Sequence, residues 1–281
     1  MTPDRNLPEQ LSQDPVIPGS EAPLAASAPQ PATDSPPWNG MDVLVLVAVT
    51  IVSGFLFLAA AISLAAMLHV DGAGTHGESA VVLFTDVRVI LPPQLLTYLV
   101  VFFFMIQIVQ RRYGQRFLPA LRWNWPARRW SSFVLVGVAL AFVVSVLNNY
   151  LPETKNLPID LLFQRRSAVF LLAGFGIFLA PFMEEFFFRG FLYPVLLRRM
   201  GLASAVILTA IAFMTIHISQ LGGSWSPLLV IFGVGLVLTL VRALTGSVAA
   251  SVLAHAGYNA TLFLMLYFGT QGFHHFEPLT K

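Results

Sequence analysis

The chain contains no cysteine, and only 11% of its 281 residues are charged. The absence of cysteine excludes a disulfide framework, a thiolate metal site, a thiol nucleophile and lipid attachment to cysteine. A formal net charge of +2 gives no reason to expect nucleic acid as a partner. Hydrophobic residues, in contrast, make up 56% of the chain, and the mean hydropathy is +0.74. This composition indicates an integral membrane protein rather than a soluble domain.

Seven segments are apolar and long enough to cross a bilayer as helices, since about 20 residues at 1.5 Å per residue cover its hydrocarbon core. They are expected at residues 42–69, 89–110, 131–149, 168–199, 203–221, 226–243 and 247–268. The predicted fold class is therefore all-α, a polytopic transmembrane bundle of about seven to eight helices.

Composition divides the chain into four parts. Residues 1–40 hold nine prolines and five acids against one arginine, which predicts a disordered tail. Residues 41–164 carry the first three helices and a basic loop at 111–130. Residues 165–270 carry the remaining helices, and 271–281 form a short C-terminal tail.

The basic loop predicts the orientation, because its six arginines and three tryptophans are typical of a cytoplasmic loop at the membrane surface. Binding of RNA or of lipid head groups is the alternative interpretation of this loop. Counting crossings from it places the N-terminus inside, so we expect a protein of the bacterial inner membrane with a cytoplasmic N-terminus. The count also puts Arg198, Arg199 and Arg242 inside, and Asp71, Glu78, Asp86, Glu153 and Asp160 outside.

Three ionisable residues interrupt the apolar run 168–200: Glu184, Glu185 and Arg189. Each costs about 2.5 to 3.5 kcal/mol at the centre of a membrane helix, so such residues face a protein interior or a wet cavity and mark function. Glu185 and Arg189 are four residues apart with the acid first, which favours an intrahelical ion pair. Glu184 is rotated by about 100° from Glu185 and is available to another partner.

Two histidines and an asparagine stand in later spans. Glu184 and His217 each lie about 24 Å along their helices from the break near Gly201, and His255 and Asn259 about 14 and 20 Å from the next turn. The four polar groups can therefore converge in one layer of the membrane. The last helix adds a stripe with a period of four residues, made by Ser247, Ser251, His255 and Asn259.

These residue types suit hydrolysis of a peptide bond. Glu184 is the candidate general base, with His217 opposite it to hold the attacking water. His255 and Asn259 can donate N–H groups to the developing oxyanion. Glu185 and Arg189 form a structural pair, and Phe213 is expected to wall the site.

The combination of Glu184-Glu185 with Arg189, Phe213 with His217, and His255 with Asn259 resembles the CPBP family of intramembrane proteases. This family includes the CAAX prenyl endopeptidases and the bacteriocin-immunity-type proteins, and is also called Abi. The resemblance covers about residues 165–268. It implies a metal-independent glutamate protease without a cofactor, acting on a protein or peptide substrate, including membrane-anchored ones, from a cavity that opens to the cytoplasm.

Three alternatives remain open at this stage. A zinc enzyme would use Glu184, His217 and His255 as ligands, although the helical His-Glu-x-x-His arrangement is missing. A transporter also collects buried Glu, His and Arg, but it predicts a repeat that the chain lacks. A scaffold that binds partner helices after losing activity is the third interpretation.

Overall fold

The computed structural model describes residues 36–68, 86–152, 154, 157–163 and 166–273. All of them fall within the compact unit Asp34–Lys281. None of these residues forms a strand, which confirms the all-α fold class. The predicted tails up to residue 35 and from residue 274, and the acidic residues Asp71, Glu78 and Glu153, lie outside the described ranges.

The chain forms helices joined by short turns. In chain order they are α1 (Gly40–Met67), α3 (Val87–Gln107), the π-helix η1 (Ile108–Arg112), α4 (Phe117–Ala120), α5 (Trp130–Asn148), the 3₁₀ helix η2 (Pro158–Phe163), α6 (Arg166–Gly174), the π-helix η3 (Phe175–Leu179), α7 (Ala180–Glu185), the π-helix η4 (Phe186–Leu192), α8 (Tyr193–Thr215), α9 (Trp225–Thr245) and α10 (Val248–Gly269).

Six stretches of the described chain are long and apolar enough to cross a membrane. Five of them are single spans, and the sixth runs through 50 residues, Arg166–Thr215. Gly201 breaks that stretch with φ +76° and ψ 175°, a backbone conformation that glycine adopts without a steric penalty. The predicted break near Gly201 is confirmed; that the chain crosses the membrane seven times stays a prediction.

The end of α8 differs from the prediction. Helical structure was expected through residue 221, but α8 ends at Thr215, and residues 216–223 form turns. The side chains of Thr215 and His217 contact the carbonyls of Ile211 and Phe213, respectively, and Gly222 and Gly223 follow with positive φ. After Thr215 the backbone N–H groups of His217 and Ile218 donate to the carbonyls three residues earlier, so His217 lies in a turn and not in an α-helix.

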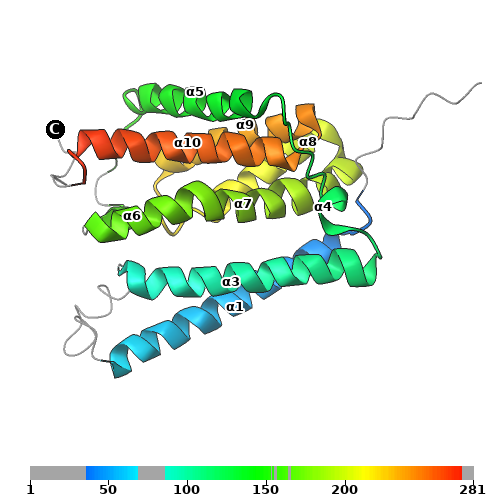
Figure 1. Cartoon of the computed structure of the whole chain (residues 1–281), viewed down its shortest axis with the longest axis horizontal. Helices are drawn as coiled ribbons and strands as arrows, with labels where there is room; N and C mark the ends of the chain where they lie inside the picture. The colour runs from blue at the N-terminus through cyan, green and yellow to red at the C-terminus, as the bar shows by residue number, and fades with distance from the viewer. Residues whose placement is uncertain (1–35, 69–85, 153, 155–156, 164–165, 274–281) are drawn as a thin grey trace, which may run out of the picture. The chain divides into compact units, whose positions relative to one another are not determined.

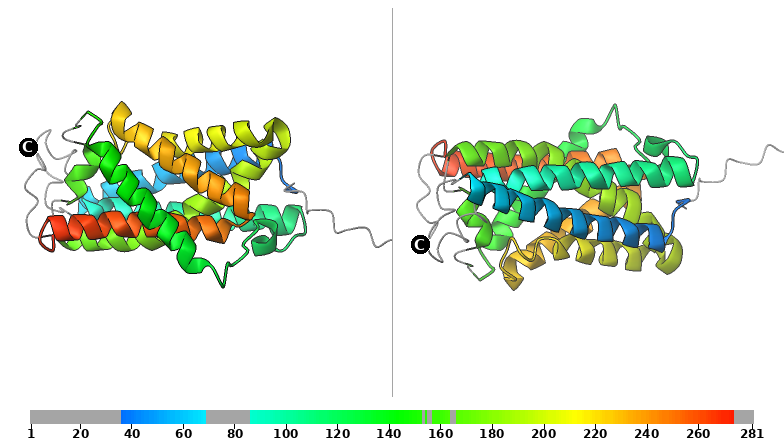
Figure 2. Two further views of the ribbon diagram at one scale, coloured as in Figure 1. Left: turned by 90° about the horizontal axis from the view of Figure 1, so that it is seen from above. Right: turned by 90° about the horizontal axis from the view of Figure 1, so that it is seen from below.

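Figure 1 shows α1 and α3 side by side, the stretch from α6 to α7 next to α3, and α10 beyond that stretch. Seen from above, α5 crosses α10 obliquely (Figure 2). Glycines permit this crossing, because a Cβ at Gly137 of α5 would lie 2.0 Å from the carbonyl oxygen of Ala254. A Cβ at Gly257 of α10 would lie 2.6 Å from the carbonyl oxygen of Val134. Small residues at the contact thus let the last helix pack closely against α5, as is usual between membrane helices.

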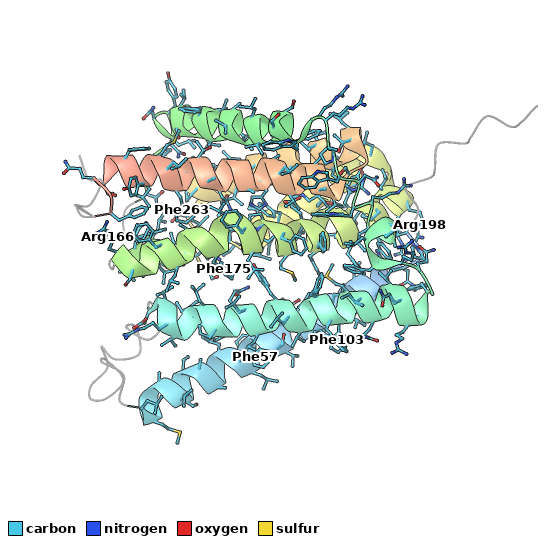
Figure 3. The ribbon with its side chains drawn as sticks, in the orientation of Figure 1. Phe57, Phe103, Arg166, Phe175, Arg198 and Phe263 are labelled. Atoms are coloured by element: carbon cyan, nitrogen blue, oxygen red, sulfur yellow. The ribbon has the colours of Figure 1, made fainter. Side chains whose placement is uncertain are left out.

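One end of the bundle gathers the basic loop, the start of α1 and the part of α8 next to the break at Gly201. Arg112 Nη1 lies 2.6 Å from Asp42 Oδ1, and Arg198 donates to the carbonyl of Trp38 at 3.0 Å. Arg198 is labelled at this end in Figure 3. Two further hydrogen bonds, Asn124 Nδ2 to Gly246 O and Val248 N to Arg122 O, join the loop to the turn between α9 and α10. The segments that the crossing count assigned to one side thus lie together; that this side is cytoplasmic stays a prediction.

The outer surfaces of the spans are apolar, as a lipid environment requires. Phe103 of α3, for example, is 54% exposed (Figure 3). The phenylalanines that follow the two glutamates behave differently. Phe186 and Phe188 are buried, and Phe186 packs against the rings of Phe182 and Trp123 at 4.2 and 5.2 Å. These two side chains therefore pack inside the protein and do not face lipid.

Candidate active site

Two π-helices flank the short helix that carries the glutamates. The π-helix η3 precedes Pro181 and η4 precedes Pro194. A proline lacks the N–H that would donate to the carbonyl four residues earlier, so regular α-helical bonding cannot continue through either position. Single π turns of this kind free backbone carbonyls and occur often at functional sites. The sequence therefore widens the helix on both sides of Glu184 and Glu185.

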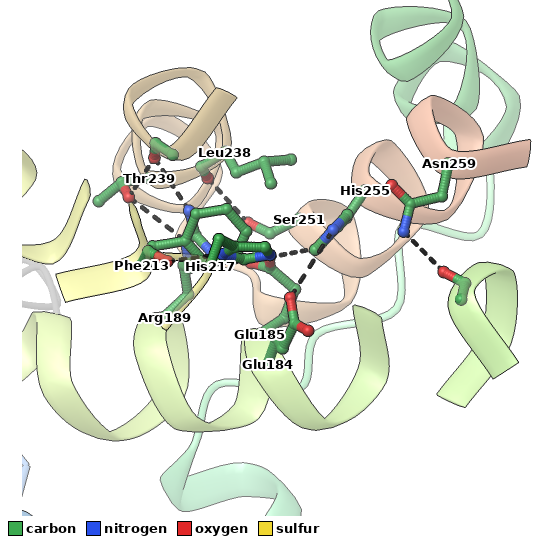
Figure 4. Close-up of polar contacts among 12 residues, drawn as sticks. Glu184, Glu185, Arg189, Phe213, His217, Leu238, Thr239, Ser251, His255 and Asn259 are labelled. Atoms are coloured by element: carbon green, nitrogen blue, oxygen red, sulfur yellow. Dashed lines mark hydrogen bonds and ion pairs between the residues drawn. The ribbon is translucent and has the colours of Figure 1, made fainter. Parts of the chain in front are cut away.

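Glu185 is at the centre of the polar cluster shown in Figure 4. Its Oε1 lies 2.8 Å from Nη1 of Arg189 and 2.9 Å from Nδ1 of His255. All three side chains are almost completely buried. The predicted intrahelical pair of Glu185 and Arg189 is present, and it extends to an imidazole of α10. A charged pair in this environment needs several hydrogen bonds to offset its lost hydration.

Arg189 obtains those further bonds from α9. Its Nη2 donates to the carbonyl of Gly235 at 2.9 Å, and its Nε donates to Oγ1 of Thr239 at 3.2 Å. Its Cζ lies 4.6 Å above the centre of the Phe213 ring, a cation–π distance. Sequence reasoning missed Gly235 and Thr239, although two small residues four apart in a membrane helix are a signal for close helix contact.

Phe213 lies between the two histidines and the arginine. Its ring centre is 4.9 Å from that of His217 and 5.7 Å from that of His255. The residue is only 1% exposed. The predicted role of Phe213 as a wall of the site agrees with this position.

Glu184 is the more accessible of the two glutamates, with 13% of its side chain exposed. Its Oε2 lies 3.9 Å from Nε2 of His255, which is too long for a direct hydrogen bond and within ion-pair range. Because Glu185 holds Nδ1 of the same ring, the second ring nitrogen is directed toward Glu184. Tyr98 of α3 stacks its ring on Phe175 of η3, with ring centroids 5.6 Å apart, and this residue was not anticipated from the sequence.

His217 is placed beside Phe213 and not against Glu184. Its Nδ1 lies 2.9 Å from the carbonyl oxygen of Phe213, so this nitrogen donates and Nε2 is the nitrogen with a lone pair in the neutral ring. Within the described part of the chain, the histidine that reaches ion-pair distance of Glu184 is His255. Glu184 thus has His255 as its ion-pair neighbour, and the expected pairing of Glu184 with His217 stays a prediction.

Asn259 also has a specific contact. Its Nδ2 donates to the carbonyl of Gly176 in the π-helix η3 at 2.6 Å (Figure 4). Its side chain thus joins α10 to the segment that leads into α7. An asparagine amide carries two N–H groups, and this contact uses one of them.

A metal centre was considered with Glu184, His217 and His255 as ligands. Among the residues described by the structure, no three His, Asp or Glu side chains are grouped so that they could share a metal ion. The donor arrangement does not fit a three-ligand zinc site.

The fold and the site define a class: a multi-spanning helical membrane protein with a buried glutamate, histidine and arginine cluster. Residues 166–261 match the family model of the type II CAAX prenyl endopeptidases, described as Rce1-like. The match confirms the family resemblance seen in the motifs, for about a third of the chain, and that segment includes every predicted site residue from Glu184 to Asn259. Searches of the curated proteins and of the solved structures find no match.

Proposed function

We propose that the protein is an intramembrane endopeptidase in which Glu184 activates water for attack on a peptide bond. The family match supports a peptidase of the CAAX type, embedded in the membrane. The observation that carries the mechanism is the approach of Glu184 to His255 at 3.9 Å, with the far side of the imidazole bound to Glu185 and through it to Arg189. This arrangement places a carboxylate next to an oriented imidazole in a poorly hydrated interior.

The gap between Glu184 Oε2 and His255 Nε2 suits an oxygen atom that hydrogen-bonds to both. In the proposed reaction a water oxygen forms a bond to the carbonyl carbon of the substrate while Glu184 takes one of its protons. The carbonyl oxygen becomes an oxyanion. The proton on Glu184 then passes to the amide nitrogen as the carbon–nitrogen bond breaks, which gives a carboxylic acid and an amine.

His255 is the proposed oxyanion donor. Its Nδ1–H is directed to Glu185, which fixes the ring and stabilises positive charge on it. Its Nε2–H can then donate to the oxyanion. Asn259 has its second N–H for the same purpose, and His217 has Nε2 available to a water or a substrate group.

The Glu185 and Arg189 pair is proposed to support the reaction without taking part in proton transfer. Arg189 is held by three separate acceptors on α7 and α9, so it is rigid. A rigid cation keeps Glu185 ionised and in place, and Glu185 in turn keeps His255 oriented. Oriented, buried charges lower a barrier more than mobile ones, because they need no reorganisation during the reaction.

The proposed substrate is a membrane-associated or lipidated protein or peptide. The reaction needs no metal in this proposal. If zinc were bound by the same residues, a chelator would remove the activity and added zinc would restore it.

The test is cleavage of a peptide panel by the full-length protein in detergent, analysed by mass spectrometry. The panel includes prenylated peptides that end in a CAAX sequence and unmodified peptides of the same length. Glu184→Gln removes the base while keeping the shape, and we expect a loss of roughly 10²- to 10⁴-fold in kcat. His255→Ala should lose about 10²- to 10³-fold as an oxyanion donor. A chelator should leave the wild-type rate unchanged.

Asp160→Asn is the matched control, because this carboxylate lies in η2 and accepts a hydrogen bond from the backbone N–H of Leu157, away from the cluster. It should cleave like the wild type. Equal cleavage by the wild type and Glu184→Gln, or cleavage that depends on zinc, would refute the proposal.

A further inference from the structure

Helix α9 carries none of the proposed catalytic residues, yet it provides two of the hydrogen-bond acceptors of Arg189. The Nε of Arg189 donates to Oγ1 of Thr239 at 3.2 Å, and its Nη2 donates to the carbonyl oxygen of Gly235 at 2.9 Å. Thr239 and Gly235 are four residues apart, so they share one face of α9. Figure 4 shows Thr239 beside Arg189 in the polar cluster. A helix outside the catalytic set therefore orients the guanidinium group.

The hydroxyl group of Thr239 is used twice. A guanidinium group can only donate, so Oγ1 accepts from Arg189 and its own hydrogen goes to another acceptor. That acceptor is the carbonyl of Gly235 at 2.7 Å, the same oxygen that accepts from Nη2 of Arg189. Three hydrogen bonds thus form a closed ring. The ring fixes the plane of the guanidinium group, because the group is flat and is held at two of its nitrogens.

The third nitrogen of the guanidinium group carries this orientation to the site. Nη1 of Arg189 donates to Oε1 of Glu185 at 2.8 Å, and the same oxygen lies 2.9 Å from Nδ1 of His255. The side chains of Arg189, Thr239 and Glu185 are completely buried, so bulk water does not replace a missing partner. A change in the angle of the guanidinium group would therefore move Oε1, and the imidazole with it.

Helix α10 has its own attachment to α9, which does not involve Arg189. The Oγ of Ser251 donates to the carbonyl of Leu238 at 3.2 Å, and Leu238 belongs to one buried cluster with Ala254. This attachment keeps α9 and α10 together when the hydroxyl group of Thr239 is removed. A loss of activity on that removal then reflects the orientation of the guanidinium group and not a separation of the two helices.

We propose that Thr239 is a positioning residue, which fixes the guanidinium group of Arg189 and through it the imidazole of His255. This inference rests on the proposed function, because it assigns Thr239 a role in preparing the oxyanion donor. A donor that is already oriented stabilises the transition state without reorganisation. Thr239 does not contact the substrate in this proposal, so its hydroxyl group acts on the chemical step and not on substrate binding.

Thr239→Val tests this assignment, because it keeps the branched shape of the side chain and removes the hydroxyl group. We expect kcat to fall about tenfold with KM unchanged, as for loss of one hydrogen bond to a charged group. Thr239→Ser keeps the hydroxyl group and should have a kcat close to that of the wild type. Thr239→Ala removes the same hydroxyl group, and it takes the place of Thr239→Val if that variant does not fold.

Thr261→Val is the matched control. Thr261 is also a buried threonine of a membrane helix, and its Oγ1 donates to the carbonyl of Gly257, four residues earlier, at 2.8 Å. This variant loses the same hydrogen bond within a helix, but that bond involves no arginine. Its kcat and KM should match those of the wild type.

A second measurement separates this inference from the proposed function, because it needs no substrate. In protein with isotope-labelled histidine, the imidazole N–H that is hydrogen-bonded to Glu185 gives an NMR signal whose position depends on that bond. The variant His255→Gln identifies the signal. It should shift in Thr239→Val and keep its wild-type position in Thr239→Ser and in Thr261→Val.

The outcomes of the two measurements are distinct. If the wild type cleaves no peptide but the signal shifts in this pattern, the proposed function fails and the role of Thr239 stands. The role is refuted if the signal is the same in Thr239→Val and the wild type, or if Thr239→Ser behaves like Thr239→Val. It is also refuted if the wild type cleaves peptides and Thr239→Val has the same kcat.

Discussion

Replacement of Gly137 by alanine tests how α5 is held against the helix that carries His255 and Asn259. The new Cβ would lie 2.0 Å from the carbonyl oxygen of Ala254 and 2.6 Å from the amide nitrogen of Tyr258. Both are backbone atoms, which no rotamer change can move aside. Since real Cβ atoms essentially never approach closer than 3.0 Å, the two helices would have to separate by about 1 Å.

The burial of the two helices indicates which of them gives way. Half of the residues in the apolar part of α10 are buried inside the protein. In the apolar part of α5 only 17% of the residues are buried. The helix α10 is held by α5 on one side and by the stretch from η3 to η4 on the other, so α5 is expected to move outward. The contacts of His255 and Asn259 with Glu185 and Gly176 should therefore survive.

The predicted effect is a loss of stability with little change in the site. Overpacking of a close contact costs about 1 to 3 kcal/mol, and this contact is severe enough to reach the upper part of that range. The gain in helix propensity from glycine to alanine offsets about 1 kcal/mol. Gly233→Ala in α9 gains the same helix propensity, but nothing lies within 4 Å of its Cβ position. This variant therefore measures the effect of helix propensity on stability without overpacking.

The assay is thermal unfolding of the purified protein in detergent, with peptide cleavage measured well below the midpoint. Gly137→Ala should unfold at a clearly lower temperature than the wild type, and Gly233→Ala at the same or a higher temperature. Cleavage by both should remain close to wild type. Equal midpoints for the two variants would refute the packing argument, and loss of cleavage in stable Gly137→Ala protein would show that α10, not α5, had moved.

Three further predictions concern the end of the bundle that we assign to the cytoplasm and the buried cation Arg189. Trp38 is fully buried, stacks on Phe191 at 4.4 Å and donates to its carbonyl at 3.0 Å, so Trp38→Ala should destabilise by about 3 to 5 kcal/mol and expose the start of α1 to proteases. Arg189→Ala would leave a carboxylate buried without its cation, at a cost of about 3 to 5 kcal/mol that should appear as low yield and a low unfolding temperature. The hydrogen bond that Tyr113 donates to Asp42 raises the pKa of Tyr113 above 10.0; its stabilising effect is complete below that pH and is lost as the pH rises through the raised pKa. Asp42→Asn should therefore lower the pH at which tyrosinate absorbance from this residue appears, with Tyr113→Phe as the blank, and an unchanged titration would contradict the assignment.

The spacing of residues along the chain was sufficient to predict the local features of the site. Glu185 and Arg189 pair because residues four apart on a helix are neighbours, whatever surrounds them. Ser247, Ser251 and His255 are buried together for the same reason. The break at Gly201 follows from a glycine between two apolar runs. Each of these depends only on helix geometry and on the cost of exposing polar groups to lipid.

The end of α8 was predicted less well, because hydropathy does not register a helix terminus inside an apolar segment. His217 was placed in a helix at the depth of Glu184, but α8 ends at Thr215, and the backbone N–H groups of His217 and Ile218 donate to carbonyls three residues earlier. The actual neighbour of His217 is Phe213. Its relation to Glu184 could therefore not be obtained by counting residues from a turn.

The sequence by itself determined that this is a helical membrane protein, where its spans lie, and which polar residues those spans bury. Only the tertiary structure decided that His255 faces Glu184, that Asn259 binds the carbonyl of Gly176, and that Tyr98 of α3 stacks on Phe175. The physical reason is that these contacts depend on how each helix is rotated and how closely it approaches its neighbours. Those quantities are set by glycines, π-helices and side-chain packing between segments far apart in the chain, and no periodicity within one segment encodes them.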